Sequence, residues 1–204
     1  MLRGYNIKRK VNYKKNKTAI FYENLVKIEG REIYYDNIEG VGFMYEDVTH
    51  TALYMFPVAR TLTGNTALYV KNEKKPVAIS ITGKRILGIT FGQAPQNAQK
   101  EFGEMFDIID LLITTRIAQR YLEQIYAGDE VEVAGLLIKQ ESAVGKRRKD
   151  TIIDKENYGG MQHTFNHGIV LDKDGEHLWR MPLTGSAKNV TVLPYILDEL
   201  FLIT

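Results

Sequence analysis

A helical pattern between Phe102 and Tyr126 constrains this fold more than any other feature of the sequence. Apolar residues recur in it at separations of three and four, the period of a helix with one apolar face. Gly128 follows the pattern, and glycine is the usual left-handed stop of a helix. We therefore expect one long helix over about 96–127. The residues of its apolar stripe are Phe102, Met105, Phe106, Ile109, Leu112, Ile113, Ile117, Tyr121 and Ile125.

Short segments on both sides of this helix alternate apolar and polar residues, as strands do. Short strands at close spacing favour an antiparallel barrel or sandwich over a parallel sheet. The segment 46–64 fits this pattern poorly, because its apolar stretch 53–57 stops at a proline; it indicates an edge strand or a loop plugging a barrel. The segments predicted as strands are 19–22, 25–28, 32–35, 41–45, 66–70, 77–81, 131–139, 151–153, 161–166, 169–171 and 177–181.

A second helical pattern follows at about 190–203, with Pro194 in its first turn, where proline is tolerated. Each half of the chain is therefore predicted to contain strands followed by one amphipathic helix. This predicts an α+β fold with mostly antiparallel strands and two domains, at 1–127 and 128–204. The apolar face of the second helix comprises Leu193, Ile196, Leu197, Leu200 and Phe201.

The composition excludes several kinds of site. The 204 residues contain no Cys, so there is no disulfide, no thiolate metal site and no cysteine nucleophile. No segment approaches the ~20 consecutive apolar residues that a membrane-spanning helix needs. Residues 1–12 lack the apolar run of a signal peptide. We therefore expect a cytoplasmic protein, with a peripheral place at the membrane as the alternative.

Basic residues concentrate near the N-terminus. Residues 1–22 contain seven Lys or Arg and no Asp or Glu, whereas the whole chain has a net charge of +2. A basic arm of this kind binds nucleic acid, anionic lipid or an acidic protein face. Its alternating apolar residues also fit an edge strand, where lysines discourage aggregation. The candidate anion-binding residues are Lys8, Arg9 and Lys10 in the arm and Lys146, Arg147, Arg148 and Lys149 in a later turn.

Two stretches in the first half, 25–28 and 31–41, resemble the strand–turn–strand signature of bacterial pleckstrin-homology-like (PH-like) domains. The second half is similar to an uncharacterised group of PH-like proteins, in which a late strand tryptophan like Trp179 precedes an apolar helix. The resemblance implies two tandem bent barrels, each capped by a helix, and no catalysis. Lipid-binding relatives use a basic loop in the first hairpin. Here that loop, at 23–24, is acidic, and the basic cluster 146–149 is predicted on the next hairpin.

Two local patterns imitate metal sites. His163 and His167 form H-x-x-x-H, but glycines on both sides indicate strand and turn, in which four residues span ~13 Å. By that spacing the two rings cannot share one ion. The run 172–176 begins like a calcium loop but lacks its glycine and its final glutamate, so Asp-Gly here indicates a hairpin turn. We expect no metal and no cofactor.

The leading functional hypothesis is a non-catalytic binding or scaffolding protein that contacts another protein or itself. Its predicted contact residues are Tyr54, Phe56, Ile117 and Tyr121. One alternative is peripheral binding to anionic lipid through the arm and the 146–149 loop. Another is a hydrolase with a His–carboxylate site assembled around His163 and His167. Nucleic acid is not expected as a partner.

We also expect both halves of the chain to share the long helix. A helix of about 30 residues extends ~45 Å, more than one small barrel needs as a cap. Its first part is expected to close the first barrel through Phe102, Phe106 and Ile109. Its later part, with Ile117, is expected to pack on the second barrel or on a second subunit.

Overall fold

A computed structural model of the chain forms two compact units. Unit 1 comprises Met1–Glu39 and Phe43–Ile113, and unit 2 comprises Gly40–Gly42 and Thr114–Thr204. The structure describes residues 7–14, 17–52, 56–147, 150–163, 167–182 and 187–202.

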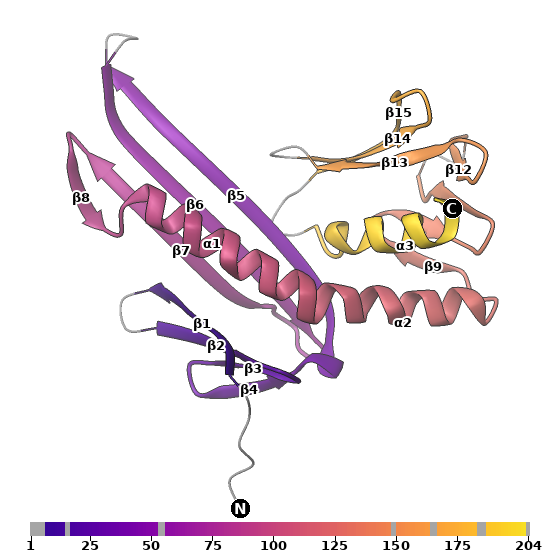
Figure 1. The fold of residues 1–204 in the computed structure, drawn as a ribbon, viewed down its shortest axis with the longest axis horizontal. Helices are drawn as coiled ribbons and strands as arrows, with labels where there is room; N and C mark the ends of the chain where they lie inside the picture. Colours follow the sequence, from indigo (N-terminus) through magenta and orange to yellow (C-terminus); the bar gives the residue numbers. More distant parts are fainter. Residues whose placement is uncertain are drawn as a thin grey trace, which may run out of the picture. The chain divides into compact units, whose positions relative to one another are not determined.

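In its described residues, unit 1 contains two antiparallel sheets and one α-helix (Figure 1). The first sheet has the order β1-β2-β3-β4, with β1 Ile7–Lys14, β2 Lys17–Tyr22, β3 Leu25–Ile28 and β4 Arg31–Tyr34. After a 3-10 turn, η1 Tyr35–Asn37, the second sheet has the order β5-β6-β7-β8. Its strands are β5 Ile38–Ala52, β6 Phe56–Val70, β7 Val77–Ile86 and β8 Ile89–Gly92. Helix α1, Pro95–Ile109, follows.

Helix α1 lies against strands β6 and β7 and closes the core of unit 1 (Figure 1). Its Phe102, Met105 and Ile109 are buried, as the helical period predicts. The helix approaches the sheet closely because the strands present glycines to it. A Cβ at Gly64 would overlap the Phe102 ring, and one at Gly83 would lie 2.6 Å from the Cα of Pro95.

The long helical pattern is confirmed, with an interruption that its period does not indicate. Between α1 and helix α2, Thr115–Tyr126, the backbone forms a π-helical segment, η2 Asp110–Thr114. The helix stops where predicted: Gly128 has φ +96° and its N–H donates to the carbonyl of Ile125.

The described part of unit 2 contains two more antiparallel sheets and two α-helices (Figure 1). One sheet has the order β12-β11-β10-β9, with β9 Val131–Val133, β10 Leu136–Ile138, β11 Ser142–Gly145 and β12 Ile152–Asp154. The other has the order β13-β14-β15, with β13 Tyr158–His163, β14 His167–Asp172 and β15 His177–Pro182. The 3-10 turn η3, Val190–Val192, leads into helix α3, Leu193–Phe201.

Helix α2 belongs to unit 2, so the two units divide at residue 113 and not at the expected 127. The physical reason is the apolar stripe of α2, whose Ile117, Ala118 and Ile125 are buried. Helix α2 contacts α3, β9 and η3, and α3 buries its own apolar face. The order of strands and helices along the sequence therefore does not predict where the two units separate. The first part of the long helical pattern, α1, packs in the core of unit 1, and the second part, α2, packs in the core of unit 2.

The α+β class with mostly antiparallel strands is confirmed. Among the described residues the strands form four sheets, none of them closed, so the tandem PH-like barrel stays a prediction. The structure differs from expectation over 46–64. Its described residues lie in β5 and β6, two strands of 15 residues each. Pro57 is the second residue of β6 and precedes the pairing of β6 with β7, which begins at Ala59.

Candidate functional site

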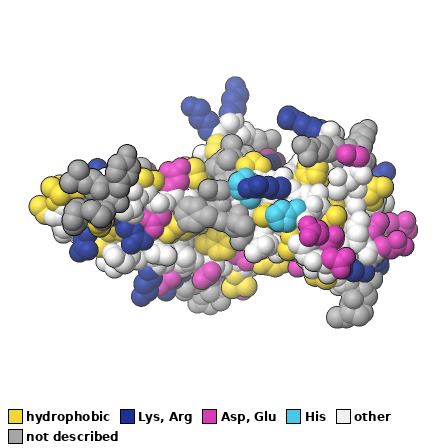
Figure 2. All heavy atoms as spheres, turned by 90° about the horizontal axis from the view of Figure 1, so that it is seen from above, with side chains coloured by type: hydrophobic (Ala, Val, Ile, Leu, Met, Phe, Trp, Pro, Cys, Tyr) yellow, Lys and Arg dark blue, Asp and Glu magenta, His cyan; other side chains and the backbone are white. Residues whose placement is uncertain are grey.

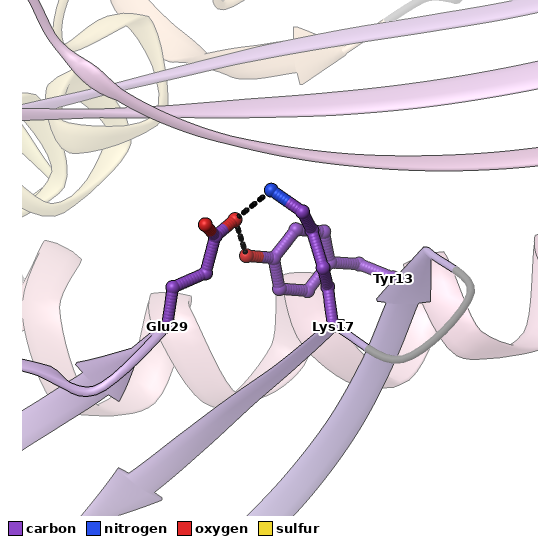
Figure 3. A network of polar contacts seen from close by, with 3 residues as sticks. All are labelled: Tyr13, Lys17 and Glu29. Carbon is purple, nitrogen blue, oxygen red and sulfur yellow. Dashed lines mark hydrogen bonds and ion pairs between the residues drawn. The ribbon is translucent and has the colours of Figure 1, made fainter.

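The basic N-terminal stretch is built into a sheet from Ile7 onward. Strand β1 is an outer strand paired with β2, which confirms the edge-strand interpretation for 7–14. Its Tyr13 is buried and donates a hydrogen bond of 2.7 Å to Glu29, whose carboxylate also accepts one of 2.5 Å from Lys17 (Figure 3). Burial, and then the neighbouring carboxylate, raise the pKa of the Tyr13 hydroxyl.

Charge pairing accounts for part of this basic stretch. Arg9 forms an ion pair with Glu104 of α1, and Lys17 forms one with Glu29. Lys10 is exposed, and the side chain of Lys8 lies outside the described residues. Two basic residues of the predicted anion-binding arm, Arg9 and Lys17, are therefore paired with carboxylates of unit 1.

The later basic turn connects β11 to β12 in unit 2. Lys146 donates to Glu132 of β9 at 2.7 Å, and its backbone N–H bonds the carbonyl of Gly135. Arg147 is exposed and forms no ion pair within the described part of the chain. Arg148 and Lys149 lie outside the described residues.

An open cleft of about 1050 Å³ runs beside this turn, within unit 2. One wall is the outer strand β15, and the other is formed by the β9–β10 and β11–β12 turns. Both faces of β15 line the cleft, as expected for a cleft along the edge of a sheet. The lining residues are Glu132, Ala134, Gly135, Lys146, Arg147, Thr151, His167, Leu178, Trp179, Arg180, Met181 and Pro182.

Arg180 and His167 meet across the β14–β15 ladder. The guanidinium Nη2 of Arg180 lies 3.1 Å from His167 Nδ1. Arginine has no acceptor, so Nδ1 accepts this bond and the proton of the neutral imidazole is on Nε2. Figure 2 shows His side chains together with a Lys or Arg side chain at the surface of the molecule. The contact orients Arg180 without neutralising it, since Arg180 forms no ion pair within the described residues.

Trp179 lies on the same strand, between Leu178 and Arg180. Its indole Nε1 is buried and donates to no described residue. A buried N–H without an acceptor is rare in folded proteins and calls for an explanation.

A second cavity of about 550 Å³ shares Glu132, Met181 and three other lining residues with the cleft.

Unit 1 carries a different surface, at the hairpin of β7 and β8. Leu87, Ile89 and Phe91 are 75%, 64% and 53% exposed, and all four residues of β8 face solvent. We name Leu87, Ile89 and Phe91 the apolar hairpin. Sequence reasoning missed this strand; the alternation of Ile89 and Phe91 after the Leu87–Gly88 turn was the available signal.

The four predicted contact residues fall in different environments. Tyr54 lies outside the described residues; Phe56 begins β6, but its side chain is also outside them. Ile117 is 2% exposed in unit 2, so it has no free surface to offer a partner. Tyr121 is half-buried, and its hydroxyl accepts a bond of 3.2 Å from Asn189 Nδ2.

The predicted strand geometry at the two histidines is confirmed, whereas residues 164–166 between them lie outside the described residues. His163 ends β13 and His167 begins β14, with His163 opposite Gly168 in the ladder. The side chain of His163 is not among those described, so a joint site stays untested. Among the described residues, no group of three or more His, Asp or Glu side chains is placed to hold a metal ion.

The calcium-like run is a hairpin turn, as predicted. The Oδ1 of Asp172 accepts the backbone N–H groups of Asp174 and Glu176 at 2.9 and 2.8 Å. Gly175 has φ +84°, the left-handed conformation that such a turn requires. The carboxylate is thus committed to the turn.

Comparisons with protein-family models, with curated proteins and with solved structures found no match to this chain. In the described part of the chain, none of the helices combines the length and the apolar character needed to cross a bilayer. Two surfaces of the molecule have features that suit a ligand or a partner, the apolar hairpin of unit 1 and the cleft of unit 2.

Proposed function

We propose that this protein is a non-catalytic binding module that associates with a second copy of itself through strand β8. The observation that carries this proposal is the apolar hairpin, three large apolar side chains more than half exposed next to an outer strand. An outer strand presents unpaired backbone N–H and C=O groups, and another strand satisfies them best. Apolar side chains beside such an edge add burial to the pairing.

Charge favours a second copy as the occupant. The other outer strands of unit 1, β1, β4 and β5, each carry at least two charged residues, which oppose pairing with an identical strand. Strand β8, Ile-Thr-Phe-Gly, carries none. Two copies related by a twofold axis bring the same uncharged strand together antiparallel, so the contact is self-complementary.

The small area of the apolar hairpin and strand β8 limits the affinity of the proposed dimer. A four-residue strand and three apolar side chains bury less than the ~1,200 Å² below which interfaces are weak or transient. The proposal is therefore a concentration-dependent dimer, with monomer prevailing on dilution. An oligomer that stays intact on dilution would need a larger interface than this one.

Sedimentation velocity over a range of concentrations tests the proposal. Ile89→Lys places a charge in the pairing strand, and we expect it to leave only monomer at concentrations where the wild type associates. Ile152→Lys is the matched control, an exposed isoleucine on an outer strand of unit 2, and it should leave association unchanged. A wild-type protein that is monomeric throughout, or equal association in both variants, contradicts the proposal.

Peripheral membrane binding through the arm is the second candidate, and less supports it. Arg9 and Lys17 are engaged with Glu104 and Glu29, and β1 is held in a sheet. Less supports the hydrolase as well, since the Nδ1 of His167 lies beside the guanidinium of Arg180 and the side chain of His163 lies outside the described residues.

A further inference from the structure

The cleft of unit 2 carries an inference that is independent of self-association. We propose that this cleft binds an organic phosphate, with the phosphate held by Arg147 and Arg180 and a flat ring packed against Trp179. The three residues come from the β11–β12 turn and from strand β15, and the cleft brings them together.

The charge of the cleft selects an anion. Lys146, Arg147 and Arg180 line it against a single carboxylate, Glu132, and that carboxylate is already paired with Lys146. Arg147 and Arg180 therefore remain as cations without an ion-pair partner among the described residues. Guanidinium groups match the oxygens of a phosphate with two parallel hydrogen bonds, which an ammonium does not. The contact with His167 holds Arg180 in place for this role.

The volume of the cleft selects an organic compound over a bare anion. About 1050 Å³ slightly exceeds the roughly 300–1,000 Å³ of pockets that take small organic ligands, so the cleft has room for one. Apolar side chains, Leu178, Trp179 and Met181, lie next to the cations. A bare inorganic phosphate would leave the half-buried side chains of Leu178 and Trp179 in contact with water. A flat ring covers them and stacks on an indole face, as nucleobases do on aromatic side chains.

The indole N–H of Trp179 is buried, and no described residue accepts from it. Because this atom has almost no accessible surface, an acceptor in the cleft reaches it only when the indole turns toward the cleft on binding. The choice of ligand therefore depends on the cations and on the apolar side chains, and a ligand that combines a phosphate with a flat ring suits both.

Trp179 also provides the assay, because it is the only tryptophan of the chain. Its fluorescence, excited at the red edge of tryptophan absorption, reports on the cleft. The probes are ATP, inorganic tripolyphosphate and adenosine, which separate the ring from the phosphates. We expect saturable binding of ATP, at least tenfold weaker binding of tripolyphosphate and of adenosine, and the same order by isothermal titration calorimetry.

Two variants and one control test the assigned residues. Arg147→Gln and Arg180→Gln should each weaken ATP binding at least tenfold. Both side chains are exposed, so neither change removes core packing. Lys155→Gln removes one charge from an exposed residue of unit 2 that does not line the cleft, and binding should stay within twofold of wild type. Trp179→Phe, followed by calorimetry, should also weaken binding, because the smaller ring offers less surface for the ligand to stack on.

Several outcomes would overturn the assignment. Binding that is absent for all three probes refutes it. Equal affinity for ATP and tripolyphosphate removes the ring from the site, and equal affinity of the wild type and both arginine variants removes the cations. Vesicles of phosphatidylglycerol, compared with phosphatidylcholine, form the last arm. A response of Trp179 to the anionic vesicles without a response to ATP assigns the cleft to a lipid headgroup and contradicts a soluble ligand.

Discussion

The buried tyrosine Tyr158 in unit 2 makes a sharp test of how the core is held together. Its side chain is 1% exposed, and its hydroxyl donates to Asp198 Oδ1 at 2.5 Å. The ring meets Phe201 of α3 edge-on, with 6.0 Å between ring centroids. Strand β13 and helix α3 are therefore joined by one hydrogen bond to a carboxylate and by an aromatic contact.

Tyr158→Phe keeps the aromatic contact and removes the hydroxyl. Asp198 is half-buried, so it loses a donor that water replaces only in part. Loss of a hydrogen bond to a charged group costs about 1.5–3 kcal/mol. We expect the free energy of unfolding at neutral pH to fall by about that amount.

The raised pKa of Tyr158 predicts how the stability difference between the wild type and Tyr158→Phe changes with pH. Burial, and then the hydrogen bond to Asp198, raise the pKa of Tyr158 above its ordinary value. The folded protein keeps this proton at pH values where the unfolded chain has lost it. The stabilisation is therefore complete below pH ~10 and is lost as the pH rises, by about 1.4 kcal/mol at one unit above the ordinary pKa. Phenylalanine has no such proton, so the deficit of the variant should shrink by that amount.

Urea unfolding followed by Trp179 fluorescence measures both effects, because Trp179 and Tyr158 lie in the same unit. The comparison is made at about pH 8 and about pH 11, on either side of the ordinary tyrosine pKa of about 10. Tyr126→Phe is the control, since Tyr126 is 52% exposed; its free energy of unfolding should follow that of the wild type at both pH values. A deficit of Tyr158→Phe that is the same at both pH values would refute the assigned pKa shift.

Three further predictions concern single contacts. Gly64→Ala should lower the free energy of unfolding by about 1–3 kcal/mol, because the new methyl overlaps the Phe102 ring. Gly103→Ala, with open space around it in α1, should raise the free energy of unfolding by about 0.5–1 kcal/mol. Thermal unfolding compares the two variants. Ile117→Asp buries an unpaired charge and should cost several kcal/mol in unit 2, while Tyr126→Asp, at an exposed position of the same helix, should cost little in the same urea titration. Hydrogen bonds from Arg60 at 2.9 and 2.6 Å lower the pKa of Asp47, so Asp47→Asn should lose stability at neutral pH. The gap to the wild type should close as the pH falls below ~4, and a gap that persists in acid would contradict that contribution.

Local patterns in the sequence predict much of this fold because short-range physics decides them. The three-and-four spacing of 102–125 requires a helix to bury its stripe, whatever the stripe packs against. The Asp172–Gly175 turn follows from a side chain that bonds its own backbone and from a glycine at positive φ. The same reasoning fails over 46–64. There the strands β5 and β6 alternate apolar residues with Thr, Glu and His, and partner strands provide the pairing.

Local sequence patterns also do not predict which residues meet in the cleft of unit 2. The basic turn at Lys146 and Arg147 is visible in the sequence, but nothing in it indicates that Arg180 and Trp179 lie across from them. Residues from separate sheets meet in the cleft only after both sheets have formed, and the register of β14 with β15 decides that Arg180 reaches His167. A shift of one residue in that register would turn Arg180 to the opposite face.

The sequence by itself determined the helical segments, the Asp172–Gly175 turn and the antiparallel α+β class, because each depends on residues close together in the chain. Tertiary structure decided which unit receives α2. It also placed β8 at the outside of a sheet and brought two arginines beside the one tryptophan. These features depend on contacts between distant segments, and burial of apolar surface, which is not directional, selects among many such contacts only when the whole core is packed.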